Sequence, residues 1–290
     1  MNLVQKINTR LVTPILGFPR RLDSELLLWR VKRKLRERSD LPYTLKPMPE
    51  ILQYRQSDTM FIFGSGPSVN DLTPEELEKI RRCDTLSFNR FCYKPIVECK
   101  FHLTHDIYGE WKPLNWKFHV EKCRAYASSF FKYQRQPIQL LQGDPYGFAS
   151  RMLVAESLLP PQSICSIYEE RKNSRNMAIL PDRNEWTLMH GRGTLIDCVH
   201  FAFLMRYQKI VLVGVDLTNT AYFFLKEGES DPDNDRRGLK LTDKHTTSDA
   251  MMELLPKWAS VMKAAGSELS IYSKRSMLAS CLPLFKWDPS

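Results

Sequence analysis

Short apolar runs alternate along the chain with segments of helical spacing and with polar turns. The clearest run spans residues 209–216 and is apolar almost throughout, as a central parallel strand must be when helices cover both of its faces. Further strands are predicted at residues 59–63, 84–88, 100–104 and 268–272, and helices at residues 194–207 and 248–265. Because strands alternate with helices, the pattern predicts a parallel α/β sheet with right-handed crossovers.

The N-terminal part differs from the rest of the chain in charge. Residues 1–40 contain ten Lys and Arg but four Asp and Glu, which accounts for most of the net charge of +9. Apolar residues recur there at helical spacing among many cations (Leu27, Leu28, Val31 and Leu35). A helix of this kind within residues 20–38 suits two situations: insertion into a membrane surface beside anionic headgroups, or packing on the protein's own domain with a solvated basic face.

Prolines at positions 42, 47 and 49 predict a linker after this helix. We therefore divide the chain into a basic amphipathic N-terminal segment with its linker, residues 1–50, and a Rossmann-like domain, residues 51–290. A nucleic-acid reader would carry its basic face on the folded domain, so we expect no nucleic-acid partner.

Composition excludes further classes of protein. No apolar run approaches the ~20 residues that span a bilayer, and the N-terminus lacks the pattern of a signal peptide. The seven cysteines are scattered without a C-x-x-C pair, which favours reduced thiols in a cytoplasmic protein. Cys and His do not cluster along the chain as they do in structural zinc sites, so we expect no metal cofactor of that kind.

Two loops follow the first two predicted strands. Gly64 and Gly66 lie in the loop Gly64-Ser65-Gly66-Pro67-Ser68, where the lack of a Cβ lets backbone amides approach a ligand such as a phosphate. Asn89 ends the next strand and offers both a donor and an acceptor to a base or ribose. Open α/β sheets bind ligands at this edge. Taken singly, the loop also fits an ordinary strand-to-helix turn, and Asn89 an ordinary turn residue, because the third glycine of a dinucleotide motif and the lysine of a Walker loop are absent.

Together these loops resemble the bacterial sialyltransferases of glycosyltransferase family 42 and their wider relatives, the flagellin-modifying Maf proteins and the archaeal pterin pyrophosphokinase-like proteins. Residues 207–216 resemble that family's central strand, which ends in Gly-hydrophobic-Asp, and residues 244–249 resemble its segment with a catalytic histidine before a helix. The resemblance covers residues 59–275 in the same order. It implies a Rossmann-like, GT-A-like variant sheet. The basic N-terminal helix has no counterpart in the core family and would be an appendage, and the polar loop after the central strand would be a lid loop.

The resemblance also implies roles for individual residues. The residues that would bind the CMP part of the donor are Gly64, Ser65, Gly66, Pro67, Ser68, Asn89, Thr194 and Asp216. His245 matches the general base, Tyr222 a phosphate-binding tyrosine, and Arg192 lies within one position of a family arginine. Ser65 stands where the sialyltransferases usually carry asparagine, and Thr218 near a second tyrosine. These departures favour another CMP-keto sugar, such as Kdo, as readily as sialic acid.

The implied reaction is an inverting transfer from a CMP-sugar to a glycan or glycolipid acceptor, such as a lipopolysaccharide or capsule precursor. A histidine near neutrality suits removal of the acceptor proton. Among the other histidines, His105 beside Asp106 is the best competitor of His245. The protein would be cytoplasmic, with peripheral attachment to the inner membrane surface through residues 20–38.

Alternative functions remain open. Asp231, Asp233 and Asp235 lie in the long loop after the central strand, where a mobile lid without metal is favoured. They would instead hold Mg²⁺ or Mn²⁺ if the protein were a pyrophosphokinase of the pterin type that uses ATP. A third alternative is a membrane-recruited nucleotide-binding module without catalysis.

Overall fold

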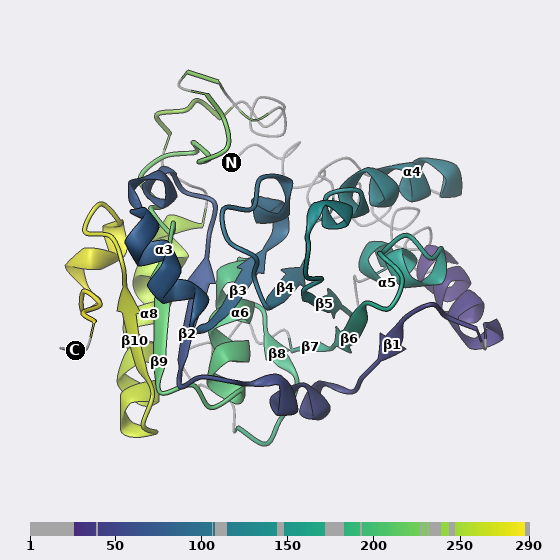
Figure 1. The fold of residues 1–290 in the computed structure, drawn as a ribbon, viewed down its shortest axis with the longest axis horizontal. Coiled ribbons are helices and arrows are strands. Elements are labelled where there is room, and N and C mark those ends of the chain that lie inside the picture. Colours follow the sequence, from purple (N-terminus) through teal and green to yellow (C-terminus); the bar gives the residue numbers. More distant parts are fainter. Residues whose placement is uncertain are drawn as a thin grey trace, which may run out of the picture.

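The computed structural model describes residues 26–38, 40–105, 107, 115–143, 148–171, 183–191, 193–226, 228–229, 231, 239–243 and 247–287. The main sheet has eight strands in the order β1-β6-β5-β4-β3-β2-β9-β10, and every pair is parallel (Figure 1). Its strands are β1 (Thr44–Leu45), β2 (Thr59–Phe63), β3 (Asp84–Phe88), β4 (Phe101–Thr104), β5 (Ile138–Gln142), β6 (Ile164–Tyr168), β9 (Lys209–Val213) and β10 (Glu268–Ile271). The predicted parallel α/β sheet is confirmed.

The strand order reverses between β2 and β9. From β2 to β6 the chain adds each new strand on one side, whereas β9 and β10 lie on the other side of β2. In open α/β sheets, ligands bind at the carboxyl ends of the strands where the order reverses. A second, two-stranded sheet pairs β7 (Glu170–Arg171) with β8 (Leu188–Met189), and Glu170 contacts His105 just after the carboxyl end of β4.

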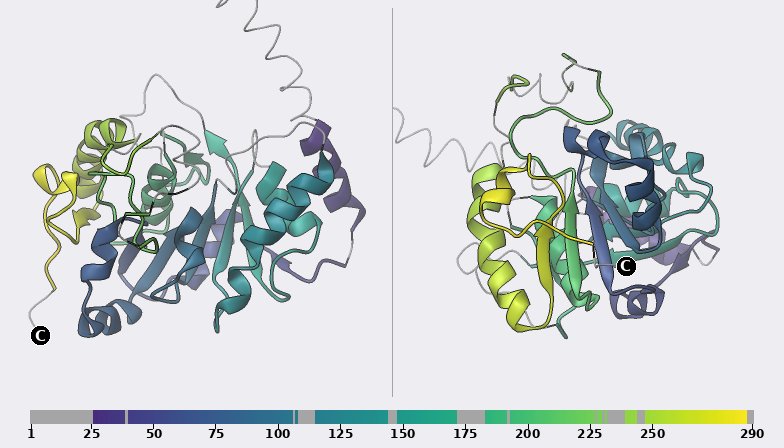
Figure 2. Two further views of the ribbon diagram at one scale, coloured as in Figure 1. Left: turned by 90° about the horizontal axis from the view of Figure 1, so that it is seen from above. Right: turned by 60° about the vertical axis from the view of Figure 1, so that its left-hand side comes forward.

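Helices cover both faces of the main sheet. They are α3 (Pro74–Arg81), α4 (Trp116–Ala127), α5 (Phe148–Ala155), α6 (Thr194–Leu204) and α8 (Ser248–Ala264), with short 3-10 turns at Met48–Tyr54, Pro67–Asp71, Asn89–Tyr93, Phe130–Lys132 and Met277–Ser280. Alternate residues of β2 show the two faces, because Met60 joins the core under α6 and α8 whereas Phe61 joins a core with Ile80 of α3. The right-hand view of Figure 2 shows α8 and α3 on opposite sides of the sheet.

The predicted helix that ends at residue 207 is shorter in the structure. It stops at Leu204, and Arg206 then adopts a positive φ of 61° that a helix does not allow. Tyr207 is buried and donates a hydrogen bond of 2.7 Å to Asp84 Oδ2, at the start of β3. Burial of this residue therefore reflects packing against the sheet and not a further turn of helix.

The predicted linker contains an edge strand of the sheet. Thr44 N–H donates to Ser163 O over 3.0 Å, and Lys46 N–H donates to Cys165 O over 2.9 Å, so that β1 pairs with β6. The strand is two residues long, and the Leu45 side chain is exposed. Neither length nor hydrophobic alternation marks such a strand in the sequence. The prolines at positions 42, 47 and 49 therefore predict a linker where the fold has an edge strand.

A helix over residues 26–37 packs on α4 and α5. Leu27, Leu28 and Val31 are buried in the same core as Cys123 and Met152 of those helices. Some of its cations also contact the domain. The Arg30 guanidinium lies 4.0 Å from the centre of the Trp116 ring, Lys34 pairs with Glu156, and Arg38 donates to Ala155 O over 3.0 Å.

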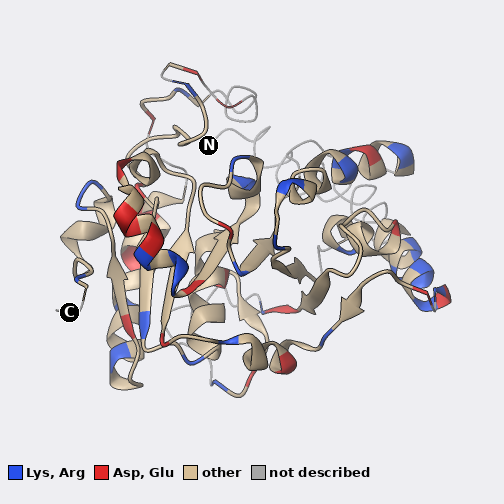
Figure 3. Ribbon diagram, viewed as in Figure 1, with Lys and Arg blue, Asp and Glu red and all other residues tan. Residues whose placement is uncertain are grey.

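The opposite side of this helix faces outward. Trp29 is 54% exposed and Leu26 is 43% exposed, next to the exposed Arg33 and Arg36. Figure 3 shows Lys and Arg along both this helix and α4. The second of the two predicted situations, packing on the domain, is therefore observed for residues 26–37, with an apolar and basic strip left on the surface. Among the described helices, none combines the length and apolar character that a membrane crossing requires.

Candidate functional site

The turn after β2 is bonded to the end of β9. Gly64 N–H donates to Val213 O over 2.8 Å, and Gly66 N–H donates to Gly214 O over 2.7 Å. A Cβ on Gly64 would lie 2.5 Å from Gly214 O, which is closer than any side chain allows. The glycines of this loop therefore permit a close approach between two strand ends.

Asp216 completes the turn. Its Oδ2 accepts a 2.8 Å hydrogen bond from Ser68 N–H, and its Oδ1 accepts one from the Ser68 hydroxyl. A Cβ on Gly66 would lie 2.7 Å from the same Oδ2. The N–H groups of Gly64, Gly66 and Ser68 therefore bond within the protein, and binding of a phosphate or nucleotide by this loop stays a prediction. Asp216 is 5% exposed and holds the loop in shape, while a direct contact with a donor stays a prediction.

Asn89 joins three elements at the edge next to this turn. Its Nδ2–H donates to Thr194 Oγ1 over 3.0 Å, and its Oδ1 accepts from the His105 backbone N–H over 3.1 Å. The residue has a φ of 47°, a left-handed conformation that asparagine tolerates better than most residues. Thr194 is the first residue of α6, so the amides at the positive end of this helix lie beside Asn89.

Tyr222 lies next to the glycine turn. The following residue, Phe223, donates its N–H to Ser65 O over 2.9 Å. The Tyr222 ring stacks on Phe224 at 5.2 Å between ring centres, and the Arg90 guanidinium lies 5.6 Å from the Tyr222 ring centre. The predicted phosphate-binding tyrosine therefore reaches the same edge of the sheet as the loop after β2.

Asp231, the first acid of the predicted metal run, forms an ion pair with Arg90. Asp233 and Asp235 lie outside the described residues, so a metal at these three acids stays a prediction. His245 and Arg192 also lie outside the described residues. The described chain resumes at Thr247, and a Cβ on Gly193 would lie 3.2 Å from Thr247 Cγ2. The start of α8 thus lies beside the start of α6.

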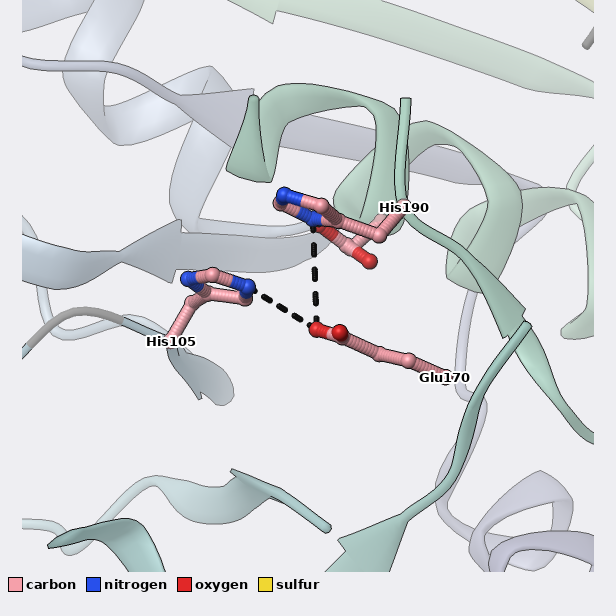
Figure 4. Close-up of side chains that lie close together, drawn as sticks. His105, Glu170 and His190 are labelled. Carbon is pink, nitrogen blue, oxygen red and sulfur yellow. Dashed lines mark hydrogen bonds and ion pairs between the residues drawn. The ribbon is translucent and has the colours of Figure 1, made fainter. Parts of the chain in front are cut away.

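A second group of side chains lies close to Asn89, whose Oδ1 accepts the backbone N–H of one of its members, His105. The sequence does not predict these side chains as a group. The group consists of His105 after β4, Glu170 of β7, His190 after β8 and Asp197 in the first turn of α6. One ligand atom from each lies within 4.8 Å of all the others. His105 Nε2 lies 2.9 Å from Glu170 Oε1, and His190 Nδ1 lies 3.9 Å from the same oxygen (Figure 4). His190 Nδ1 also lies 2.8 Å from Asp197 Oδ2. We call these four residues the histidine–carboxylate cluster.

Burial shapes the charge of this cluster. Burial raises the pKa of Asp197 to about 6, although the hydrogen bond and charge of His190 act in the opposite direction. Burial also acts to raise the pKa of Glu170, but the hydrogen bond and charge of His105 and the charge of His190 lower it below its usual value. Gln142 Nε2–H donates to Glu170 Oε1 over 2.8 Å.

Only part of this cluster could be recognised from the sequence. His105 is the best competitor of His245 in the sequence, and Asp197 carries a signal of its own, because a carboxylate inside the apolar helix Thr194–Leu204 needs a buried partner. Glu170 and His190 carry no such signal. Their place depends on the short pairing of β7 with β8.

No family model matches the chain, and no curated protein matches it either. Among solved structures, the chain is similar to the monofunctional alpha-2,3-sialyltransferase Cst-I from Campylobacter jejuni, at 13% identity and a TM-score of 0.46, over 79% of this chain and 82% of that one. It is also similar to the sialyltransferase CstII from Campylobacter jejuni in complex with a substrate analogue, at 14% identity and a TM-score of 0.43, over 78% of this chain and 84% of that one.

Proposed function

We propose that this protein is an inverting glycosyltransferase that uses a CMP-activated keto sugar. The observation that carries this proposal is the meeting of the Gly64–Ser68 turn, Asn89 and Thr194 at one edge of the sheet, where its strand order reverses. These residues lie far apart in the sequence. The turn and Asn89 belong to motifs that resemble glycosyltransferase family 42, and Thr194 falls where that family has small residues near the donor. A shared edge is what a common nucleotide site requires.

The donor would lie along this edge with its cytidine toward Asn89. The Asn89 amide makes a hydrogen bond to Thr194, and the two groups present donors and acceptors to a base or ribose. The phosphate would lie between the positive end of α6 and Tyr222, with Arg192 contributing a charge. Such donors stabilise the negative charge that develops on the phosphate as CMP leaves.

The transfer itself needs one displacement. The acceptor hydroxyl oxygen bonds to the anomeric carbon while the bond from that carbon to the CMP phosphate oxygen breaks, and its electron pair leaves with CMP. His245 takes the hydroxyl proton as general base. Support for this position is the contact between Thr247, shortly after His245, and the start of α6. A single displacement inverts the configuration of the anomeric carbon.

The acceptor would be a cell-surface glycan or glycolipid precursor, such as that of lipopolysaccharide or capsule, on the cytoplasmic side of the inner membrane. The exposed strip of the 26–37 helix, with Trp29, Arg33 and Arg36, would attach the protein to anionic headgroups there. Only the outward face of the helix would contact the membrane, since the other face packs on the domain.

A thermal-shift panel with CMP, CDP, UDP, GDP and ATP, each with and without added Mg²⁺, tests the donor class. Because a ligand that binds the folded protein raises its melting temperature, we expect stabilisation by CMP without added metal. Stabilisation by ATP only with Mg²⁺ would replace the proposal by a pyrophosphokinase. Release of CMP from CMP-Kdo or CMP-sialic acid in the presence of acceptor then tests turnover. Binding of CMP with no release from either donor would indicate a binding module.

A further inference from the structure

The histidine–carboxylate cluster has the spacing of a metal site. Ligand atoms about 2.0–2.1 Å from a tetrahedral metal lie about 3.4 Å from one another. Three of the separations bracket that value, at 2.9 Å from His105 to Glu170, 2.8 Å from His190 to Asp197 and 3.9 Å from His190 to Glu170. All four ligand atoms lie within 4.8 Å of one another. Small rotations of four side chains would bring them onto one ion.

The charges of the cluster also favour a divalent cation. The Glu170 and Asp197 side chains are fully buried, and two buried carboxylates need two positive charges nearby. The histidines could supply these only if both were protonated. Their rings stack face to face at 4.3 Å between centres, with an angle of 8° between their planes, so two imidazolium charges would repel each other strongly (Figure 4). One divalent ion balances both carboxylates and leaves both imidazoles neutral.

Two carboxylate oxygens in the cluster are left without a hydrogen-bond partner. Glu170 Oε2 and Asp197 Oδ1 are buried, and neither meets a donor among the described residues. A buried oxygen in this state is costly, and native proteins rarely retain one without a ligand, ion or water. These oxygens belong to Glu170 and Asp197, the same two residues whose negative charges need compensation. One ion would therefore balance the two charges and also give the carboxylate oxygens a partner.

We propose that His105, Glu170, His190 and Asp197 bind one divalent transition-metal ion of the zinc class. Two imidazole nitrogens beside two carboxylates suit zinc and its neighbours, whereas magnesium and calcium prefer oxygen ligands alone. Four protein ligands fill a tetrahedral shell, as in structural zinc sites. The site stands independently of the proposed transferase function.

The metal would fix the geometry of the candidate nucleotide site. It would tie the end of β4 to β7, β8 and the first turn of α6. The backbone N–H of His105 donates to Asn89, and Asp197 lies in the same helical turn as Thr194, the other partner of Asn89. The ion would therefore hold His105 directly and Thr194 through the first turn of α6, and these are the two residues that bond the Asn89 side chain.

Metal analysis of the full chain, purified without a metal-affinity tag or chelators, tests the site directly. We expect about one zinc-class ion per chain by elemental mass spectrometry. After removal of the ion with a chelator, Co²⁺ should restore about one equivalent and give the visible absorption bands of four-coordinate cobalt. Absence of stoichiometric metal from the purified protein, together with no Co²⁺ spectrum, would overturn the proposal.

Thermal unfolding separates a metal site from a plain hydrogen-bond network. Chelation should lower the melting temperature of the native chain, and Zn²⁺ should restore it. The isosteric variants Glu170→Gln and Asp197→Asn keep the side-chain volumes but lose ligand charge, so their melting temperatures should not respond to chelator or Zn²⁺. Glu185→Gln is the matched control, because Glu185 is exposed and pairs with Arg171 outside the cluster. This control should respond as the native chain does, and equal responses of all four proteins would contradict the assignment.

Discussion

Asn89 Nδ2 lies 3.0 Å from Thr194 Oγ1, so that the end of β3 is bonded to the first residue of α6. The two residues are far apart in sequence and lie on different elements. Asn89 also accepts a hydrogen bond from the His105 backbone, which adds the end of β4. A substitution at Asn89 therefore tests the arrangement of β3, β4 and α6 at the candidate nucleotide site.

We predict that Asn89→Asp weakens CMP binding at least about tenfold, which corresponds to about 1.4 kcal/mol. The aspartate keeps the acceptor for the His105 N–H but loses the donor to Thr194, and it adds a negative charge beside the expected phosphate. Isothermal titration of the variant with CMP measures the change. Asn115→Asp is the control, because Asn115 caps α4 and accepts from Phe118 N–H, a role that aspartate also fills. Equal loss in both variants, or none in either, would argue against a contact at Asn89.

We predict that His245→Ala lowers transfer from a CMP-sugar by about 10²–10⁴-fold, the usual contribution of a general base. The affinity for CMP should change less than about twofold, because the imidazole would act on the acceptor and not on the nucleotide. CMP release measures the rate, and isothermal titration measures the affinity. A variant that transfers sugar at the native rate would exclude His245 as the base.

The strands that the sequence predicts are those whose apolar runs are continuous or lie next to clear turns. Strands β5 and β6 are not predicted from the sequence, and both contain polar residues that the fold buries. Gln139 and Gln142 of β5 are buried, and so is Ser166 of β6. Their burial depends on partners brought by other strands, which a local pattern does not contain.

Helix α5 is also not predicted from the sequence, for a related reason. All residues of α5 are buried except the partly buried Ala149, so this helix shows no polar face, and Ser150 and Arg151 within it are buried. The histidine–carboxylate cluster is harder still. His105 and Glu170 meet only because the end of β4 lies beside the start of β7, which follows from the fold and not from spacing along the chain.

The meeting of β2 and β9 predicts a strong effect of Gly214→Ala on stability. Gly214 has a φ of +64°, and a Cβ there would lie 2.2 Å from Val69 Cγ2. We expect the free energy of unfolding to fall by at least about 2 kcal/mol, from the left-handed backbone and the clash together. Urea denaturation followed by circular dichroism measures it.

Gly266→Ala is the matched control for this change. Gly266 has a φ of +79°, but a Cβ there would meet nothing within 4 Å. Its cost should be about 1 kcal/mol, from the backbone alone. The difference between the two variants is then the cost of the contact with Val69. Equal costs would contradict the close packing of the Gly214 turn.

Membrane attachment through the helix over residues 26–37 should be tested by point substitutions and not by deletion of the helix. Leu27 and Val31 are buried against the domain, so removal of the helix would expose a core. It would also remove the contacts of Lys34 and Arg38 with the end of α5. Loss of binding after such a deletion would report unfolding as readily as loss of a surface.

We predict that the combined variant Trp29→Ser, Arg33→Gln, Arg36→Gln binds vesicles with anionic headgroups at least about 30-fold more weakly than the native chain. Each cation near such a surface contributes about 1 kcal/mol, and about 2 kcal/mol corresponds to about 30-fold. Loss of the Trp29 ring, which is 54% exposed, would add to this change. Vesicle flotation at several salt concentrations measures the binding.

Lys257→Gln with Lys263→Gln removes the same charge from the exposed side of α8 and should change binding little if the 26–37 helix forms the contact. If both variants lose binding equally, attraction by net charge replaces attachment through this helix; if the native chain does not float at all, no attachment exists.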